Sequence, residues 1–176
     1  MYKLVFINFI FFSFNSIALP YGGYWSPDFK RSVCLLWQTS TVEIPPGLTV
    51  TISSNFSYKG KGYELSELQQ SYGFEKERHV LEFILPGVYN SSYVKVDYPL
   101  ELYVNGEKLT KVQVKDTQYF YLTGKAVSAI LARAENGHGF DAKLKSISGE
   151  IHTVKFNDEQ LSLSTKMHFT CSENIT

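Results

Sequence analysis

The sequence has little cysteine and no excess of charge of either sign, and both features narrow the possible functions. Lysine plus arginine number 17, aspartate plus glutamate also number 17, and no block of like charge occurs. Proteins that bind nucleic acid or an anionic membrane usually carry a basic patch, so neither partner is expected. With two cysteines and four histidines that lack close metal-ligand spacing, the sequence does not predict a zinc site.

Catalytic motifs are also missing. The chain has no Gly-x-Ser-x-Gly elbow, no phosphate-binding glycine loop and no zincin motif. A catalytic triad can assemble from residues far apart in the sequence. Because no nucleophile, base or metal motif supports catalysis, we nevertheless expect a protein that is not an enzyme.

One long apolar run is present, and it lies at the N-terminus. Lys3 precedes residues 4–14, which are almost wholly apolar but too few for a bilayer span of about 20 residues. Small residues follow, as a signal peptidase requires, so we expect residues 1–18 to be a signal peptide cleaved between Ala18 and Leu19. No second apolar run follows, which predicts a secreted, extracellular protein without a transmembrane span or GPI signal.

The cysteines and three glycosylation sequons suit that compartment. An even number of cysteines in an oxidising compartment favours one bridge, Cys34–Cys171, with two free or intermolecular thiols as the alternative. The bridge would close a loop of roughly 140 residues, for which loop entropy gives about 5 kcal/mol as an upper figure. Sequons begin at Asn55, Asn90 and Asn174, each a candidate N-glycosylation site that would lie at the surface.

Short segments of strand character separated by turn signals occupy most of the chain. The clearest is 33–56, where apolar and polar residues alternate over 48–52 after a Pro-Pro-Gly turn. Asn105-Gly106 is a strong two-residue hairpin signal. The other segments of strand character are 79–85, 93–104, 108–114, 118–122, 126–133, 140–147, 151–156 and 161–169.

Two segments differ from this pattern. Residues 19–31 are rich in glycine, proline and tyrosine, which predicts turns. Residues 58–77 place leucine and tyrosine at helical spacing, which predicts a short helix within a long loop.

About nine or ten short strands and 15% aromatic residues predict an all-β fold, an antiparallel β-sandwich or jelly roll. Residues 19–148 would form the sandwich. Residues 149–176 would add C-terminal strands and a tail packed on the same domain.

Several segments resemble a CUB-type domain. The order of its N-terminal segments is followed by Tyr24-Trp25-Ser26-Pro27, Cys34-Leu35-Leu36-Trp37 and residues 42–52. Its central hairpin is similar to residues 96–106, and its closing strand pair to residues 130–144. The variant that fits best is the nematode CUB-like family of small secreted proteins linked to innate defence. The resemblance covers roughly residues 24–148. It departs from the family in having two cysteines, whereas CUB domains carry two local disulfides, and in its Cys-x-x-Trp spacing.

The resemblance also raises the question of calcium, which many CUB domains bind through acidic loop residues. By position, Asp97 matches the central aspartate of that family, and Glu135 lies where a later aspartate is expected. A Ca²⁺ site needs six to eight oxygen ligands, and this sequence matches too few of them. We therefore expect solvated carboxylates and no cofactor, with calcium as the alternative.

Aromatic residues offer the best candidate ligand face. Tyr119 and Tyr121 share one face of an expected strand while Phe120 takes the other. If the tyrosines point outward, they can stack on sugar rings or anchor a protein, and Tyr24 can act likewise. Trp37, inside an apolar run, is expected in the core.

We therefore expect an extracellular recognition module that binds a protein or a glycan. The role in innate immune defence is implied by the family resemblance alone. The alternative is a carbohydrate-binding, lectin-like protein or a glycan hydrolase on the same sandwich.

Overall fold

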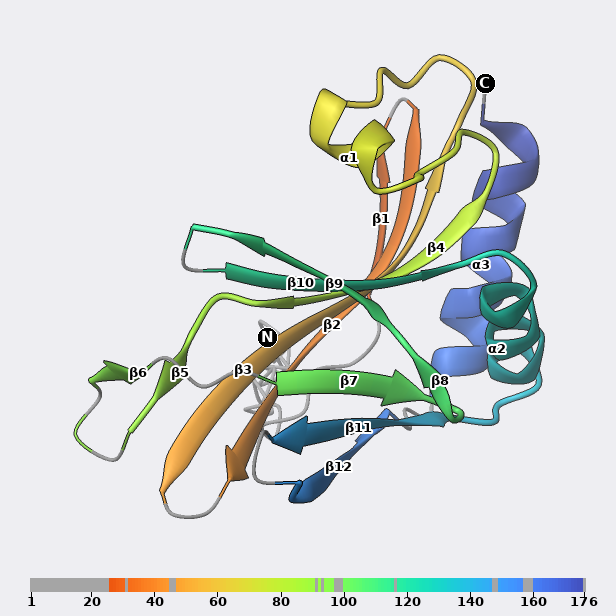
Figure 1. Cartoon of the computed structure of the whole chain (residues 1–176). Helices are drawn as coiled ribbons and strands as arrows, with labels where there is room; N and C mark the ends of the chain where they lie inside the picture. Colours follow the sequence, from red (N-terminus) through yellow and green to blue (C-terminus); the bar gives the residue numbers. More distant parts are fainter. Residues whose placement is uncertain are drawn as a thin grey trace, which may run out of the picture.

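Two antiparallel sheets and three helices make up the described part of the chain (Figure 1). The computed structural model describes residues 26–30, 32–44, 47–90, 92, 94–96, 100–115, 117–146, 149–156 and 160–175. Within them, nine strands have five or more residues and three have two. The predicted antiparallel β-sandwich is confirmed.

The large sheet contains eight strands. In spatial order, its main path is β1 (Ser26–Lys30), β2 (Val33–Ile44), β3 (Leu48–Lys59), β4 (His79–Leu85), β10 (Thr117–Thr123) and β9 (Thr110–Val114). Beside this path, β5 (Val88–Tyr89) pairs with β3 and with β6 (Lys95–Val96). The prediction of turns over 19–31 is wrong for Ser26–Lys30, because this segment pairs with β2 as an edge strand.

The small sheet has four strands, in the order β12 (Ile151–Phe156), β11 (Phe140–Ser146), β7 (Leu100–Val104) and β8 (Glu107–Lys108). The predicted Asn105-Gly106 hairpin joins β7 to β8, and both turn residues have the positive φ (50° and 85°) that this turn type requires. The predicted strand 108–114 is interrupted at Leu109. There the chain crosses from β8 in the small sheet to β9 in the large sheet.

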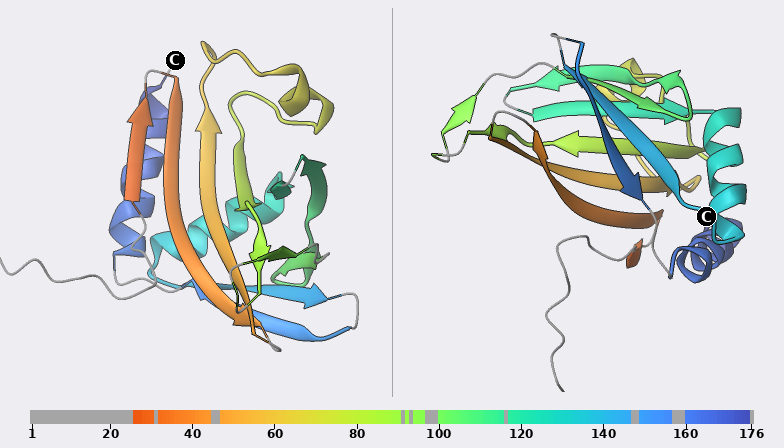
Figure 2. Two further views of the ribbon diagram at one scale, coloured as in Figure 1. Left: turned by 90° about the vertical axis from the view of Figure 1, so that its left-hand side faces the viewer. Right: turned by 90° about the horizontal axis from the view of Figure 1, so that it is seen from below.

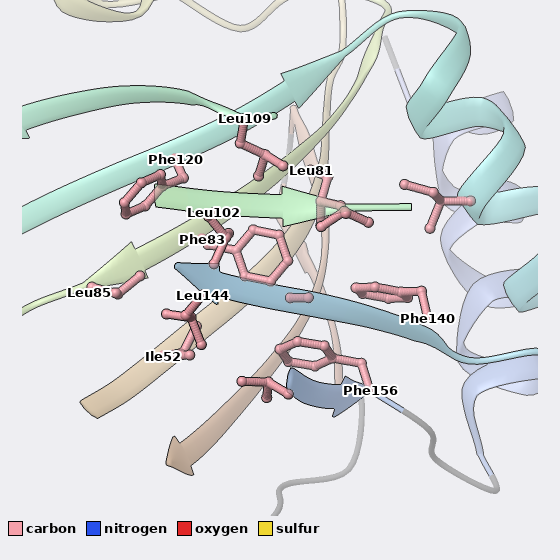
Figure 3. Close-up of a cluster of buried hydrophobic side chains, with 14 of the residues drawn as sticks. Ile52, Leu81, Phe83, Leu85, Leu102, Leu109, Phe120, Phe140, Leu144 and Phe156 are labelled. Atoms are coloured by element: carbon pink, nitrogen blue, oxygen red, sulfur yellow. The ribbon is translucent and has the colours of Figure 1, made fainter. Parts of the chain in front are cut away.

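Alternation along the long β2–β3 hairpin places one face of the large sheet against the core. In β3, Leu48, Val50 and Ile52 are buried and the residues between them are partly exposed, as predicted. Figure 3 shows Phe83 of the large sheet facing Phe140 and Phe156 of the small sheet. The Phe83 and Phe156 ring centroids lie 5.6 Å apart in an edge-to-face arrangement. This aromatic cluster joins the two layers.

Two predicted strands are helices. Residues 126–133 belong to α2 (Lys125–Glu135), and residues 161–169 belong to α3 (Leu161–Asn174). In α2, alanine-rich sequence favours a helix, and its buried residues fall at helical spacing (Val127, Ile130, Leu131 and Ala134). In α3, the buried side recurs at the same spacing but is largely polar (Leu161, Ser164, Thr165, His168 and Ser172). The C-terminal segment therefore ends in a helix, although β12 is a strand as predicted.

Helices α2 and α3 cover the same face of the large sheet as the small sheet does (Figures 1 and 2). The predicted Cys34–Cys171 disulfide is present, with Cα atoms 6.0 Å apart. It joins the helix α3 to β2, whereas the sequence predicted a link between two strands. No helix in the described residues combines the length and apolar character needed to cross a bilayer.

The opposite face of the large sheet, which we call the outer face, is only partly covered by the residues that the structure describes. The segment from Gly60 to Arg78 folds over one end of it and contains α1 (Glu67–Ser71), on the side away from α2 and α3 (Figure 1). The predicted short helix within a long loop is confirmed.

Candidate functional site

A row of large and polar side chains crosses the outer face. The strand register pairs Trp37 of β2 with Asn55 of β3, Asn55 with Glu82 of β4, and Glu82 with Tyr121 of β10. Cross-strand partners share a face, so all four side chains point away from the core. The row ends in an aromatic ring on each side and carries an amide and a carboxylate between them.

Trp37 corrects the sequence prediction. It was expected in the core, but 43% of its surface is exposed. Cys34 and Leu36 are buried on the inner side, so alternation turns Trp37 outward. The four consecutive apolar residues 34–37 obscured that alternation in the sequence.

A pocket of about 190 Å³ lies at the Tyr121 end of the row, between β10 and the segment that contains α1. Two of the three predicted ligand-face residues, Tyr119 and Tyr121, line it, and Phe120 points to the opposite, core side as expected. The complete lining comprises Ser66, Leu68, Gln69, Tyr72, Phe74, Glu82, Tyr119, Phe120 and Tyr121. The structure therefore brings the two predicted tyrosines together in a concave, aromatic surface.

Tyr121 is held in place by two other rings. Its ring stacks on Tyr72 at 5.8 Å between centroids and meets the Phe74 ring edge-on at 5.1 Å. Burial raises the pKa of the Tyr121 hydroxyl, and a hydrogen bond with Thr110 acts in the opposite direction. At neutral pH the hydroxyl is a neutral hydrogen-bonding group.

A buried polar network supports the pocket wall from below. The Ser57 hydroxyl donates to Glu82 Oε2 at 2.7 Å, and Lys59 Nζ donates to the Ser57 hydroxyl at 3.2 Å. The same ammonium lies 3.9 Å from Glu82 Oε2 and 4.8 Å from the centre of the Phe74 ring. Burial lowers the pKa of Lys59, and the Glu82 carboxylate partly offsets this effect. Lys59 of β3 thus pairs with Glu82 of β4 within the sheet, and its cation–π contact with Phe74 links the sheet to the covering segment.

Backbone and capping contacts fix the covering segment itself. Gly60 donates to the Ser32 carbonyl at 2.9 Å and Glu77 to the Lys59 carbonyl at 2.7 Å, which holds both ends of the segment. Ser66 and Gln69 form a reciprocal capping box at the start of α1. The pocket wall therefore has a defined shape before any ligand arrives.

The chemistry of this pocket suits binding. The side chains of Tyr72, Tyr119 and Tyr121 line the pocket with aromatic surface, and Glu82 and Gln69 add hydrogen-bonding groups beside them. Alternating ring faces and polar groups match a ligand that has both C–H faces and hydroxyls.

A larger cavity, of about 460 Å³, lies at the edge where the chain crosses from β8 to β9. Three lysines and Glu101 line it together with the buried side chains of Leu109 and Phe120. Lys108 pairs with Glu101, and Lys111 donates to the Leu100 carbonyl at 3.3 Å. Three of its four charged groups thus tie the crossover together, so size alone does not make this cavity the better candidate.

The remaining predicted site residues are dispersed. Tyr24, Ala18, Leu19 and Asp97 lie outside the described residues. Glu135 is the last residue of α2, and its carbonyl accepts a hydrogen bond from the Ser162 hydroxyl. Within the described ranges, no three His, Cys, Asp or Glu side chains converge as metal ligands. The calcium alternative stays untested because Asp97 is not described.

The sequons occupy three different settings. Asn55 is partly buried on the outer face, Asn90 follows β5, and Asn174 is the last residue of α3. Their glycosylation stays a prediction.

A histidine pair lies between the large sheet and α3. His79 Nδ1 is 3.3 Å from His168 Nε2, and His168 is fully buried. The rings of Tyr58 and Phe169 pack against His79 at 4.9 and 5.6 Å. Burial, and then the neighbouring His79, lowers the pKa of His168 to about 3, and burial lowers the pKa of His79. Both rings are therefore neutral near pH 7.

Sequence reasoning missed several residues of the site. Tyr72 is the tyrosine at helical spacing in 58–77, and nothing in its sequence context places it against Tyr121. Glu82 and Lys59 are far apart in the chain and meet only through strand pairing. The available signal was the alternation of inward and outward positions within strands 48–59 and 79–85, which places Lys59 and Glu82 on outward positions.

Comparisons with protein-family models, curated proteins and solved structures find no significant match. The CUB-like resemblance therefore stays a prediction.

Proposed function

We propose that this protein is an extracellular recognition module that binds a glycan in the aromatic pocket of the outer face. The observation that carries the proposal is the grouping of Tyr72, Tyr119 and Tyr121 around the Glu82 carboxylate in a cavity of about 190 Å³. A sugar ring stacks its C–H face on an aromatic ring and directs its hydroxyls to neighbouring polar groups. No catalytic step is proposed.

Pocket size favours a glycan over a protein as the ligand. A stable protein–protein interface usually involves about 20–30 residues on each partner, whereas this pocket is lined by nine. Leu68, which lies on α1 and lines the pocket, is 48% exposed. A protein partner that extended from the pocket over α1 would bury this side chain. A protein partner is thus the second candidate.

The CUB-like resemblance supports a role in host defence, in which the glycan would belong to a microbial surface. Secretion would expose the outer face to such a ligand.

A glycan array probed with the mature protein tests the proposal. The strongest oligosaccharide would then be titrated against the wild type, Tyr119→Ala and Tyr121→Ala. Loss of one stacking ring should weaken binding by about twofold to twelvefold, since aromatic contacts contribute about 0.5–1.5 kcal/mol.

Tyr103→Ala is a matched control, because Tyr103 lies on the small sheet and is also partly exposed. It should bind as the wild type does. No binding on the array would overturn the glycan proposal. Equal losses of affinity in Tyr119→Ala, Tyr121→Ala and Tyr103→Ala would show that the glycan does not bind in this pocket. A bacterial-surface pull-down that recovers a protein through Tyr121 would favour the second candidate.

A further inference from the structure

Asn55 has an exposed aromatic neighbour, Trp37. Its side chain lies on the outer face in the middle of β3, directly paired with Trp37 of β2. Cβ atoms of cross-strand partners are about 4.5–5.5 Å apart, so the two side chains are in reach of each other. Trp37 leaves 43% of its surface exposed, which is unusual for so large an apolar residue.

The amide groups of the three sequons are engaged differently. Asn90 Oδ1 accepts hydrogen bonds from the backbone of Ser92 and Val94, at 2.9 and 3.0 Å. Asn174 Nδ2, the atom to which a sugar would attach, donates to the Thr170 carbonyl at 2.6 Å. The Asn55 side chain makes no hydrogen bond with the residues that the structure describes. A sugar on its nitrogen would therefore displace no hydrogen bond of the folded structure within the described residues.

We propose that Asn55 carries an N-linked glycan whose first sugar packs against the exposed indole of Trp37. The indole offers a broad apolar surface to the C–H face of N-acetylglucosamine. The same contact would remove Trp37 from water and so account for an exposed tryptophan on a sheet face. This inference rests on the predicted secretion, and not on the proposed ligand pocket.

The attachment step uses a lipid-linked oligosaccharide as donor. Asn55 Nδ2 forms a bond to C1 of the first N-acetylglucosamine, the bond between C1 and the donor's phosphate breaks, and lipid diphosphate leaves. The amide nitrogen releases one proton. No oxidant or reductant is involved.

The folded structure dictates when this step takes place. The sequon requires the Ser57 hydroxyl, which is fully buried and donates to Glu82 at 2.7 Å under the segment that contains α1. A transferase cannot reach that hydroxyl in the folded state. Transfer to Asn55 must therefore precede closure of the 60–78 segment over β3.

The glycan would divide the outer face into two halves. The half around Trp37 would be covered by the protein's own sugar, while Tyr119 and Tyr121, beyond Glu82, would stay open to a ligand. Binding in the pocket should therefore depend on the tyrosines and not on Trp37.

The test uses the full chain secreted from a eukaryotic cell culture. Mass mapping of the peptide that contains Asn55 should show an attached glycan. Asn55→Gln should lower the melting temperature by about 2–4 °C, the shift that a single stacking contact gives in a domain of this size. It should also shift tryptophan emission to longer wavelength, whereas Asn90→Gln should do neither.

A double-mutant cycle isolates the contact with Trp37. In a Trp37→Thr background, Asn55→Gln should leave the melting temperature unchanged within about 1 °C. If Trp37→Thr is not secreted, Trp37→Phe serves in its place and should retain part of the coupling. Unglycosylated protein from a bacterial periplasm controls for the substitution itself, because there Asn55→Gln should have no effect.

An unmodified Asn55 peptide from the secreted protein would overturn the proposal. So would a glycan at Asn55 whose removal has the same effect with and without Trp37. Neither result bears on ligand binding at Tyr121, so the two proposals can fail independently.

Discussion

His168 shows how burial determines the behaviour of a single side chain. Its ring is fully buried beside His79, and its pKa is lowered to about 3. A histidine whose pKa is lower in the folded state than in the unfolded state resists protonation on folding. Its stabilising contribution is therefore present above the unfolded pKa of about 6.5 and is lost as the pH falls toward 3.

We predict that the free energy of unfolding falls by about 2 kcal/mol between pH 7.5 and pH 5 because of His168. His79, whose pKa is also lowered, adds to the loss in the same direction. Urea titrations across this range would measure it. The dependence of the unfolding free energy on pH should be weaker in His168→Gln and unchanged in His138→Gln, because His138 is exposed. An unchanged slope in His168→Gln would contradict the assignment.

Lys59 gives a second prediction at this scale. Removing one partner of a buried ion pair leaves the other uncompensated, so Lys59→Ala should destabilise the protein by about 3 kcal/mol. The double variant Lys59→Met/Glu82→Gln removes both charges and should recover most of that loss. Denaturant unfolding tests the stability, and limited proteolysis of the 60–78 segment tests whether Lys59 holds it down. Equal destabilisation of both variants would show that charge pairing is not the cause.

Single residues also show where sequence reasoning succeeds and fails. The alternation of Leu48, Val50 and Ile52 correctly predicted an inward face, because a strand has a side-chain period of two. Trp37 was misplaced, because the consecutive apolar residues 34–37 contain inward and outward positions that sequence alone does not distinguish.

At the scale of elements, α3 depends on a tertiary restraint more than on its own sequence. Its buried face is mostly hydroxyl groups and His168, so apolar burial contributes less to docking than it would in an ordinary amphipathic helix. The Cys34–Cys171 bridge compensates by fixing the helix to β2.

We predict that Cys34→Ala/Cys171→Ala lowers the free energy of unfolding by about 2–5 kcal/mol. Hydrogen exchange should accelerate in α3 by a larger factor than in α2, whose buried residues are apolar. Reduction of the wild-type disulfide is the matching control and should reproduce the change. Uniform acceleration over both helices would show that the bridge stabilises the whole molecule and not the docking of α3 in particular.

The misreading of α2 and α3 has a physical origin. Leu161 and Leu163 alternate with serine, which imitates a strand, although burial in α3 follows helical spacing. In α2, the apolar residues among 126–131 gave an ambiguous short run, and the helical propensity of its alanines was the better guide. Both helices cover the sheet at positions where a pure sandwich would have placed further strands.

At the scale of the whole molecule, the sandwich leaves the two faces of the large sheet unequal. The inner face is covered by the small sheet, α2 and α3, whereas among the described residues the segment around α1 alone covers the outer face (Figure 2). Turn signals and alternation predicted the sandwich itself. The pocket depends on β4, β10 and the α1 segment meeting in space, so sequence could indicate Tyr119 and Tyr121 but not their neighbours Tyr72 and Glu82.

Unequal coverage leads to a prediction about a core position. Phe83 of β4 lies on the inner face of the large sheet and packs on Phe156. Phe83→Ala should therefore lower the free energy of unfolding by about 3–5 kcal/mol. Ile84→Ala, the adjacent outer-face change, should cost much less because Ile84 is partly exposed. Thermal unfolding of both variants tests this difference. Similar costs at the two positions would contradict the division into a core face and an outer face.

Chemical-shift mapping by NMR tests the central claim most directly. The oligosaccharide that gives the strongest array signal would be titrated into isotope-labelled protein. We expect saturable shifts confined to Tyr72, Tyr119, Tyr121 and Glu82, with resonances of the small sheet around Tyr103 unchanged. Shifts that cluster on the small sheet or at the lysine-lined cavity, with the outer face unchanged, would contradict the account.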